Sequence, residues 1–337
     1  MSAGVRNILY VLLAAAFTGC SLVDEDLRDC GKEYSIEYSL TLVTNVSDEI
    51  ASELETPMST GLENSAANAL REYLKNIFTD YAHDVHLSFY DVAEDSLLLH
   101  REEHIMDASH SSYTLYMPER RYMHTALANV NDNPLANITG DDRCHREKLH
   151  QPVQDTLSSH TTGLFTARLP MDIQEGEDRN FYVRLYMANS AAAIVIDTTG
   201  RNIRDLKLFA TGFATDFSVC DSLYHFKSAP VFRMDSLPLG EEGCCFASVH
   251  FPSRDTEDDT KDVVTEPALW CLKAYVTTQD GSVTESVLGV TEPLKAGELK
   301  ILKAKVLDNG AVQPDDPTVA VSITLEWSGG MDIPIDL

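Results

Sequence analysis

The 337-residue sequence predicts an all-β protein with one helix, arranged as two tandem β-sandwich domains. Three observations support this prediction. Apolar and polar residues alternate with a period of two through most of the chain, which is typical of strands with one buried face. Turn residues divide these segments at intervals of roughly 8 to 12 residues, as in sandwich folds. The chain is also too long for one ordinary domain and about right for two.

The first half of the chain supplies one sandwich and the helix. Strands are predicted over residues 34–42, 85–89, 113–117, 122–130 and 181–187. Apolar residues that include Leu70 and Leu74 recur at helical spacing and predict a helix over 62–78. Thr60 followed by Glu63 gives a capping box at its start. We expect this helix to pack across the first sandwich or to cap its end.

The second half repeats the strand pattern. Strands are predicted over residues 192–196, 206–210, 246–251, 269–277, 282–288, 299–306 and 319–327. Gln279-Asp280-Gly281 is a hairpin signal between two of them. Segment 319–327 is the most regular strand, and the tail 328–337 also alternates. Both are patterned for pairing with another subunit, although they would equally well complete the second sandwich.

The N-terminus indicates an exported lipoprotein. Arg6 precedes an apolar run from Ile8 to Phe17, and small residues then lead to Cys20. A segment of this kind is removed as a signal peptide, which would leave Cys20 as the lipid-bearing first residue. The alternative is an ordinary secretory signal with an unrelated cysteine. The expected organisation is a lipoprotein signal peptide (1–19), an acidic tether (20–32), an N-terminal sandwich with helix 62–78 (33–188) and a C-terminal sandwich (189–337).

Composition limits the function further. The formal net charge is −27, from 26 Lys and Arg against 53 Asp and Glu. Nucleic acid is therefore not expected as a partner, since phosphate neutralisation needs clustered basic residues. No second hydrophobic run approaches the ~20 residues of a spanning helix, so we expect a protein that is soluble beyond its anchor. Residues 131–160 and 253–262 are predicted to be polar loops.

The remaining cysteines allow disulfides but do not form a zinc pattern. They are Cys30, Cys144, Cys220, Cys244, Cys245 and Cys271. No CxxC pair occurs among them, and an even number in an exported protein permits bridges. The sequence assigns no pairing, and a Cys30–Cys144 bridge is one option.

No motif for catalysis is present. The eleven histidines form no HExxH pattern, and neither GxSxG nor a Gly-rich phosphate loop occurs. We therefore expect no enzyme, no cofactor, no small-molecule substrate and no metal. The acidic clusters 24–26 and 257–259 lack the ligand spacing of a calcium loop. Glycan capture needs exposed aromatic platforms, and the only tryptophans, Trp270 and Trp327, lie at expected core positions.

Several segments resemble one family. They are Cys20…Asp24-Glu25-Asp26-Leu27-Arg28-Asp29-Cys30, the strand from Tyr34 to Asn45, the segment from Pro293 to Leu299, and Val319…Leu325-Glu326-Trp327. In this order, over nearly the whole mature chain, they resemble the FimB-like fimbrial anchor lipoproteins of gut and oral Gram-negative anaerobes. The resemblance implies two tandem transthyretin-like Greek-key sandwiches.

The resemblance also implies a function. A FimB-like anchor would be lipid-anchored, for example with palmitate, at Cys20 on the outer membrane and at the cell surface. It would hold a polymeric fimbria at its base, limit its length and pair with stalk subunits (fimbrillins) by β-strand addition. The candidate pairing residues are Val319, Val321, Ile323, Leu325 and Trp327. The alternative functions are a surface lipoprotein adhesin or a glycan-binding module.

A short pattern in the chain looks like the O-glycosylation sequon of exported proteins from the same bacteria. It consists of Asp, then Ser or Thr, then an apolar residue or Thr. The candidate acceptors are Ser96, Thr156, Thr198, Ser222 and Ser236.

Overall fold

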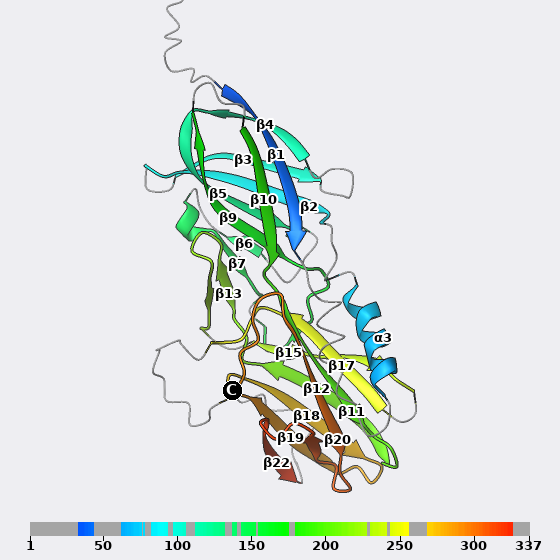
Figure 1. Ribbon diagram of the computed structural model, residues 1–337. Coiled ribbons are helices and arrows are strands. Elements are labelled where there is room, and N and C mark those ends of the chain that lie inside the picture. The colour runs from blue at the N-terminus through cyan, green and yellow to red at the C-terminus, as the bar shows by residue number, and fades with distance from the viewer. Residues whose placement is uncertain are drawn as a thin grey trace, which may run out of the picture.

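The computed structural model contains two stacked β bodies (Figure 1). It describes residues 33–43, 62–75, 77, 82–93, 97–105, 112–131, 137–139, 143–152, 154–174, 179–227, 230–240, 243–255 and 268–325. Within these ranges the structure is mostly strand, with one α-helix and one 3-10 turn. The expected all-β class with a helix is confirmed.

The N-terminal body is one seven-stranded sheet in the order β3-β2-β5-β9-β10-β1-β4. Its strands are β1 (Glu33–Val43), β2 (Asp84–Asp91), β3 (Leu98–Ile105), β4 (Ser112–Pro118), β5 (Arg120–Ala128), β9 (Phe165–Ile173) and β10 (Arg179–Met187). The sheet curls over its own core, since the Tyr38 hydroxyl of β1 donates to His124 Nε2 of β5 at 2.5 Å. Its two edge strands also approach each other, because the Tyr113 hydroxyl donates to the Ile105 carbonyl at 3.2 Å.

The C-terminal body is a sandwich of two sheets. Five strands follow the order β16-β17-β11-β20-β21 and six follow β22-β19-β18-β12-β15-β8. The bounds are β8 (Leu157–Ser158), β11 (Ser190–Asp197), β12 (Ile203–Thr211), β15 (Val231–Arg233), β16 (Asp235–Pro238), β17 (Gly243–His250), β18 (Trp270–Thr278), β19 (Val283–Val290), β20 (Leu299–Val306), β21 (Val312–Pro314) and β22 (Ala320–Leu325). Ile194, Phe246 and Leu272 fill the space between the sheets.

A small fourth sheet joins the two halves of the sequence. It contains β6 (Asn137–Thr139), β7 (Lys148–His150), β13 (Asp216–Ser218) and β14 (Leu223–His225). Leu149 and Phe217 pack in one cluster with Leu127 of β5, so this sheet covers the outer face of that strand. Segment 131–160, expected to be a loop, therefore contains short strands that need partners from the second half of the chain.

A disulfide between Cys144 and Cys220 fastens this small sheet. A Cys30–Cys144 bridge is therefore wrong, because Cys144 is already paired across a sequence separation of 76 residues. The sequence could not place these two cysteines together, because their proximity depends on the pairing of β7 with β13.

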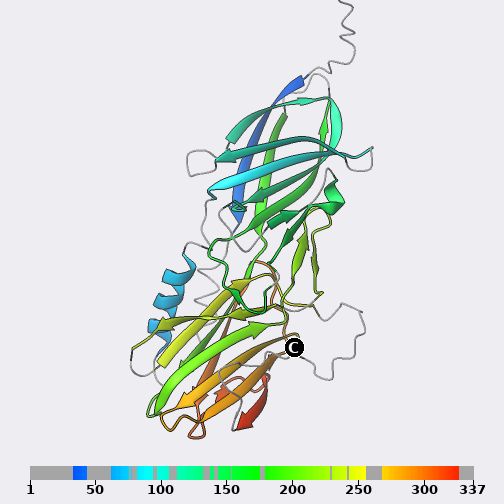
Figure 2. The ribbon, with the colours of Figure 1, turned by 180° about the vertical axis from the view of Figure 1, so that it is seen from behind.

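The helix α3 (Glu63–Leu74) packs on the C-terminal body. It contacts β16 and β17 and covers the outer face of the five-stranded sheet, as Figure 2 shows at the lower body. The expected packing on the first sandwich is wrong. The helix packs on the five-stranded sheet because small side chains there leave space for it. Ala191, Ala193 and Ala247 face the apolar side of the helix, in one cluster with Leu70. The boundary at 188/189 stays a prediction.

The start of the helix also differs from expectation. Leu62 is the N-cap residue and makes no side-chain capping bond, while Thr60 of the expected capping box lies outside the described residues. Leu62 instead packs tightly over β17. A Cβ at Gly243 would lie 2.4 Å from Leu62 Cδ1 and 2.9 Å from the Ile196 carbonyl oxygen. Only glycine allows this close approach.

Candidate functional site

The C-terminal strand β22 lies at an edge of the six-stranded sheet. It pairs antiparallel with β19, where Val321 lies opposite Leu288 and Ile323 opposite Ser286. Within the part of the chain that the structure describes, its other edge has no partner strand. An open edge presents a row of backbone N–H and C=O groups that can pair with an incoming strand.

The candidate pairing residues differ in burial. Val319 is buried in the sandwich core, whereas Val321 and Ile323 are 39% and 43% exposed. Leu325 ends the strand, with its side chain outside the described structure, and Trp327 lies beyond it. The structure thus brings Val321 and Ile323 together on an accessible edge and assigns Val319 to the core.

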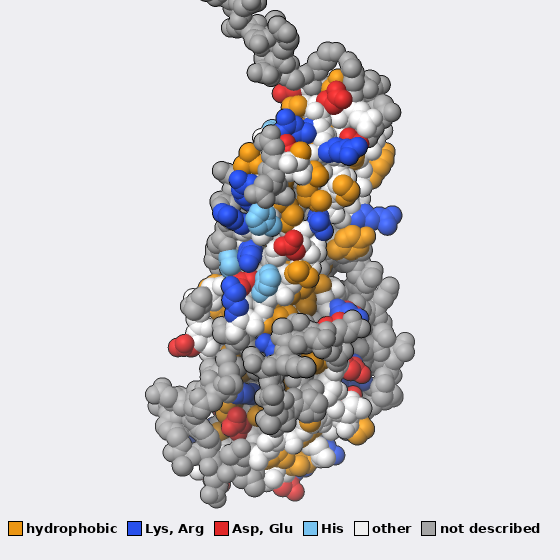
Figure 3. Space-filling model, turned by 90° about the vertical axis from the view of Figure 1, so that its left-hand side faces the viewer, with side chains coloured by type: hydrophobic (Ala, Val, Ile, Leu, Met, Phe, Trp, Pro, Cys, Tyr) orange, Lys and Arg blue, Asp and Glu red, His pale blue; other side chains and the backbone are white. Residues whose placement is uncertain are grey.

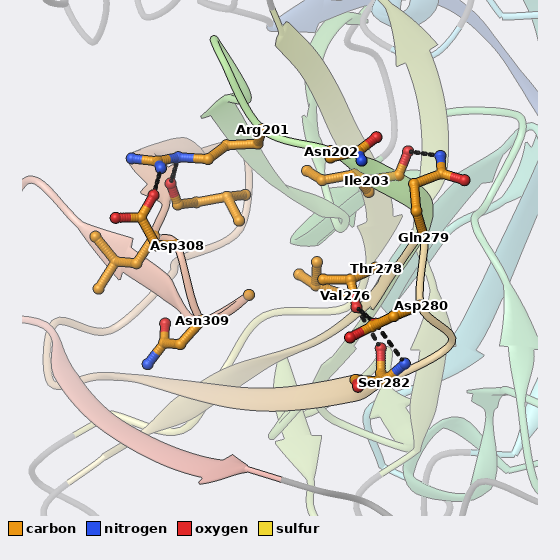
Figure 4. Close-up of a pocket in the computed structure, with 13 residues that line it drawn as sticks. Arg201, Asn202, Ile203, Val276, Thr278, Gln279, Asp280, Ser282, Asp308 and Asn309 are labelled. Carbon is orange, nitrogen blue, oxygen red and sulfur yellow. Dashed lines mark hydrogen bonds and ion pairs between the residues drawn. The ribbon is translucent and has the colours of Figure 1, made fainter.

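A hollow of about 450 Å³ opens at the far end of the C-terminal body (Figure 4). Three turns line it, at residues 201–203, 278–282 and 307–310. Arg201 Nε donates to the Val306 carbonyl at 2.8 Å, and its guanidinium also pairs with Asp308. Hydrogen bonds from Thr278 and Ser282 hold the pKa of Asp280 below its usual value. Neighbouring groups in the turns bind the charged side chains of Arg201 and Asp280. These side chains therefore stabilise the turns, and Asp280 is not an activated nucleophile.

The other site candidates are scattered over the surface. Ser222 and Ser236 are exposed, and Thr156 and Thr198 are half-buried. Ser96 and the lipidation candidate Cys20 lie outside the described residues. The structure therefore does not gather the glycosylation candidates into one region.

Four of the eleven histidines show two contrasting environments. On β3, His100 Nε2 and His104 Nε2 lie 2.6 and 2.7 Å from the two carboxylate oxygens of Glu102. Across the described ranges, no three His, Cys, Asp or Glu side chains are placed to hold a metal ion. By contrast, His160 and His250 are buried at the junction of the bodies, where desolvation lowers both pKa values to about 3.

Sequence reasoning missed a group of exposed tyrosines. Tyr116, Tyr182 and Tyr186 are 61%, 78% and 55% exposed. Trp270, in contrast, is buried as expected and donates to the Glu292 carbonyl at 2.9 Å. The alternation of β10 indicates this exposure, because Tyr182 and Tyr186 lie on the opposite side of the strand from the buried Val183 and Leu185.

The surface charge is unevenly distributed. On the flank shown in Figure 3, the upper body carries Lys, Arg and His side chains among hydrophobic ones, although the whole chain is acidic. In the stretches that the structure describes, no helix has the length and hydropathy needed to cross a bilayer.

Known structures share this fold. A protein from Bacteroides ovatus described as a "putative adhesin" aligns with a TM-score of 0.51 at 8% identity, over 89% of this chain and 97% of that one. "Putative polysaccharide binding proteins" from Bacteroides thetaiotaomicron align with a TM-score of 0.50 at 9% identity, over 84% and 98%. The fimbrial anchor protein Mfa2 from Porphyromonas gingivalis aligns with a TM-score of 0.47 at 10% identity, over 87% and 99%.

No family model matches the chain, and no curated protein matches it by sequence. The first two structures, with TM-scores of at least 0.50, establish the shared fold along most of the chain. The all-β fold class that the sequence predicts is thereby confirmed.

Proposed function

We propose that this protein is a lipid-anchored surface subunit that attaches a polymeric fimbria to the outer membrane. The observation that carries the proposal is the position of its two attachment points. The strand β1, which follows the tether from Cys20, begins at the upper end of the N-terminal body, and the open edge of β22 lies in the lower body (Figure 1). One end is thus available for the membrane and the other for a partner.

The membrane end follows from the sequence. Cleavage before Cys20 would place its thiol and amino group at the new N-terminus, where acyl chains are added. A single acyl chain gives only marginal membrane binding, whereas several chains give stable attachment. Residues 20–32 then separate the lipid from the first strand.

The partner end follows from the edge strand. A fimbrillin strand that pairs with β22 would gain main-chain hydrogen bonds, and Val321 and Ile323 would supply apolar contacts for specificity. An anchor that offers one such edge and is held at its other end can begin a fimbria, and the supply of anchors would then limit fimbrial length. The description of a Bacteroides ovatus protein with this fold as an adhesin supports a surface role. We propose that the chain has no catalytic activity and is not an enzyme.

The test is a Cys20→Ala replacement in the native host, with Ser21→Ala as the matched control. Fimbriae are measured separately on cells and in the medium. We expect the Cys20→Ala strain to release fimbriae into the medium or to carry longer ones, and the control to resemble the parent. Fimbriae that stay cell-bound and normal, while only this protein is mislocalised, would support the alternative of a stand-alone adhesin.

A further inference from the structure

The outer face of β10, β1 and β4 forms a second surface that the anchor function does not use. The three strands are neighbours in the sheet, with Tyr182 of β10 beside Ser39 of β1 and Tyr116 of β4 beside Ser35. We call the outward side chains of these strands the tyrosine face. Its described members are Glu33, Ser35, Glu37, Ser39, Thr41, Ser112, Thr114, Tyr116, Pro118, Asn180, Tyr182, Arg184 and Tyr186.

The aromatic rings of this face are open to solvent. Tyr182 is the most exposed large hydrophobic side chain in the described structure at 78%, and Tyr116 and Tyr186 are more than half exposed. Between the rings lie hydroxyls and one amide. The rings therefore stand as separate platforms on a polar sheet surface.

Arg184 lies between Tyr182 and Tyr186 on the same strand face. Among the described residues it has no ion-pair partner, although the chain contains twice as many acidic as basic side chains. Arg168 of the adjoining strand β9 is also exposed and, within the same described ranges, unpaired. The tyrosine face has two described acidic groups: Glu33 lies at its end, opposite Pro118, and Glu37 is engaged as acceptor of a 3.2 Å bond from the Thr114 hydroxyl.

This composition fits a sugar chain better than a protein partner. The apolar core of a protein interface is usually fully buried and close-packed, and the tyrosine face has no aliphatic cluster from which to build one. A pyranose ring presents C–H groups on its faces and hydroxyls around its rim. Rigid amphipathic tyrosines match the faces, and serine, threonine and asparagine side chains match the rim.

We propose that the tyrosine face binds a glycan chain that carries carboxylate groups. Tyr182 and Tyr186 are four residues apart on one strand, or ~13 Å at about 3.3 Å per residue, which spans more than one sugar ring. Arg184 lies between them, where its guanidinium can bind a carboxylate through two parallel hydrogen bonds.

The acidic surface elsewhere does not prevent this interaction. Exposed charges more than about 8 Å apart are largely screened at physiological ionic strength, so the nearby guanidinium outweighs distant carboxylates. The inference goes beyond the proposed anchor function and does not depend on it. The glycan assay below uses purified protein, and its outcome is separate from the release of fimbriae by Cys20→Ala.

The test measures binding of the full chain, purified in detergent, to immobilised polygalacturonate and to neutral dextran. We expect the parent to bind polygalacturonate and a Tyr182→Ala, Tyr186→Ala double variant to bind at least about tenfold more weakly. Arg184→Gln should weaken binding to polygalacturonate by a similar factor. Leu223→Ala, which changes an exposed side chain on β14, is the matched control and should bind like the parent.

Folding is checked by the melting temperature, which should not change because all substituted side chains are exposed. Equal binding by the tyrosine variants would overturn the proposal. Binding to dextran as strong as to polygalacturonate, without an effect of Arg184→Gln, would overturn the carboxylate requirement. A protein captured on this face in cells through Tyr182, with no glycan binding, would show that it is a protein interface instead.

Discussion

The two bodies differ in what covers the outer faces of their sheets. The outer face of the five-stranded sheet lies under α3, and there β11 is buried from Ser190 to Ile196. Among the residues that the structure describes, no helix covers the outer face of β10 and β1, and Tyr182 and Tyr186 are exposed there. The outer face of a sheet is therefore closed in one body and open in the other.

This difference shows how to interpret the residue types. Small alanines on β11 leave room for a helix, while large tyrosines and hydroxyls on β10 and β1 suit contact with an external ligand. A third surface lies between these extremes, since the small sheet covers β5 at Leu127 and is fastened by a disulfide. Four predictions test these closed and open surfaces, from the largest expected effect to the smallest.

Removing the disulfide should loosen the cover over β5. A Cys144→Ser, Cys220→Ser double variant frees a loop closed across 76 residues of sequence. The chain-entropy argument gives a loss of about 4 kcal/mol in the free energy of unfolding. Urea denaturation measures it, with Cys271→Ser, which changes a partly buried cysteine, as control. If the free energy of unfolding falls no more than in the control, the disulfide does not stabilise the small sheet.

Truncating the helix should loosen the cover over β11. Leu70 is fully buried in the cluster that joins α3 to the five-stranded sheet. Leu70→Ala should lower the free energy of unfolding by about 2–5 kcal/mol through lost burial and the cavity left behind. The exposed neighbour Arg71→Ala is the matched control and should change it by less than about 0.5 kcal/mol. If Leu70→Ala and Arg71→Ala change the free energy of unfolding equally, the helix does not pack on the sheet.

Acid should destabilise the junction between the bodies. His160 and His250 are buried, and desolvation lowers each pKa to about 3. The unfolded state therefore binds more protons than the native state between about pH 6.5 and pH 3, so stability falls as the pH falls through this range. Each histidine should contribute about 1.4 kcal/mol of lost stability between pH 7.5 and pH 5.5.

The pH prediction is checked by urea denaturation at both pH values. His250→Gln should reduce the difference between them by about 1.4 kcal/mol, whereas His145→Gln, at an exposed position, should leave it unchanged. The hypothesis of a neutral buried His250 fails if the two variants show the same pH dependence.

Charging the open edge should have little effect on stability. Val321→Lys and Ile323→Lys change exposed side chains, so each should alter the free energy of unfolding by less than about 0.5 kcal/mol. Lysine on an edge strand opposes the pairing of a further strand, so fewer fimbriae should remain attached to cells. The measurements are urea denaturation and a count of fimbriae per cell. A stable variant with normal fimbriae would exclude β22 as the partner edge.

Much of the fold could be predicted from local patterns. Period-two alternation located β1, β10 and β19, and the Gln279-Asp280-Gly281 signal located the hairpin between β18 and β19. The strand β9 was missed although its apolar residues alternate from Phe165 to Ile173, because a proline such as Pro170 inside a run argues against a strand. The short strands β6 and β7 were missed because β6 pairs only with β7, and β7 pairs with the distant strand β13.

The site was less predictable than the fold. The helix pattern showed that α3 has a buried face, but the sheet that it meets lies more than a hundred residues away in sequence. The edge position of β22 likewise depends on the order of the whole sheet. The alternation along β10 already places Tyr182 and Tyr186 on one face of the strand. The sequence prediction missed this face because it took only tryptophans as aromatic platforms for glycans.

The most direct test of both proposals compares the β22 edge and the tyrosine face in living cells. A photoreactive residue is placed at Ile323 on the β22 edge or at Tyr182 on the tyrosine face, and protein adducts are measured after illumination. The account predicts a cross-link from position 323 to another fimbrial subunit and no protein adduct from position 182. The absence of an adduct at 323, or the same protein adduct from both positions, would contradict it.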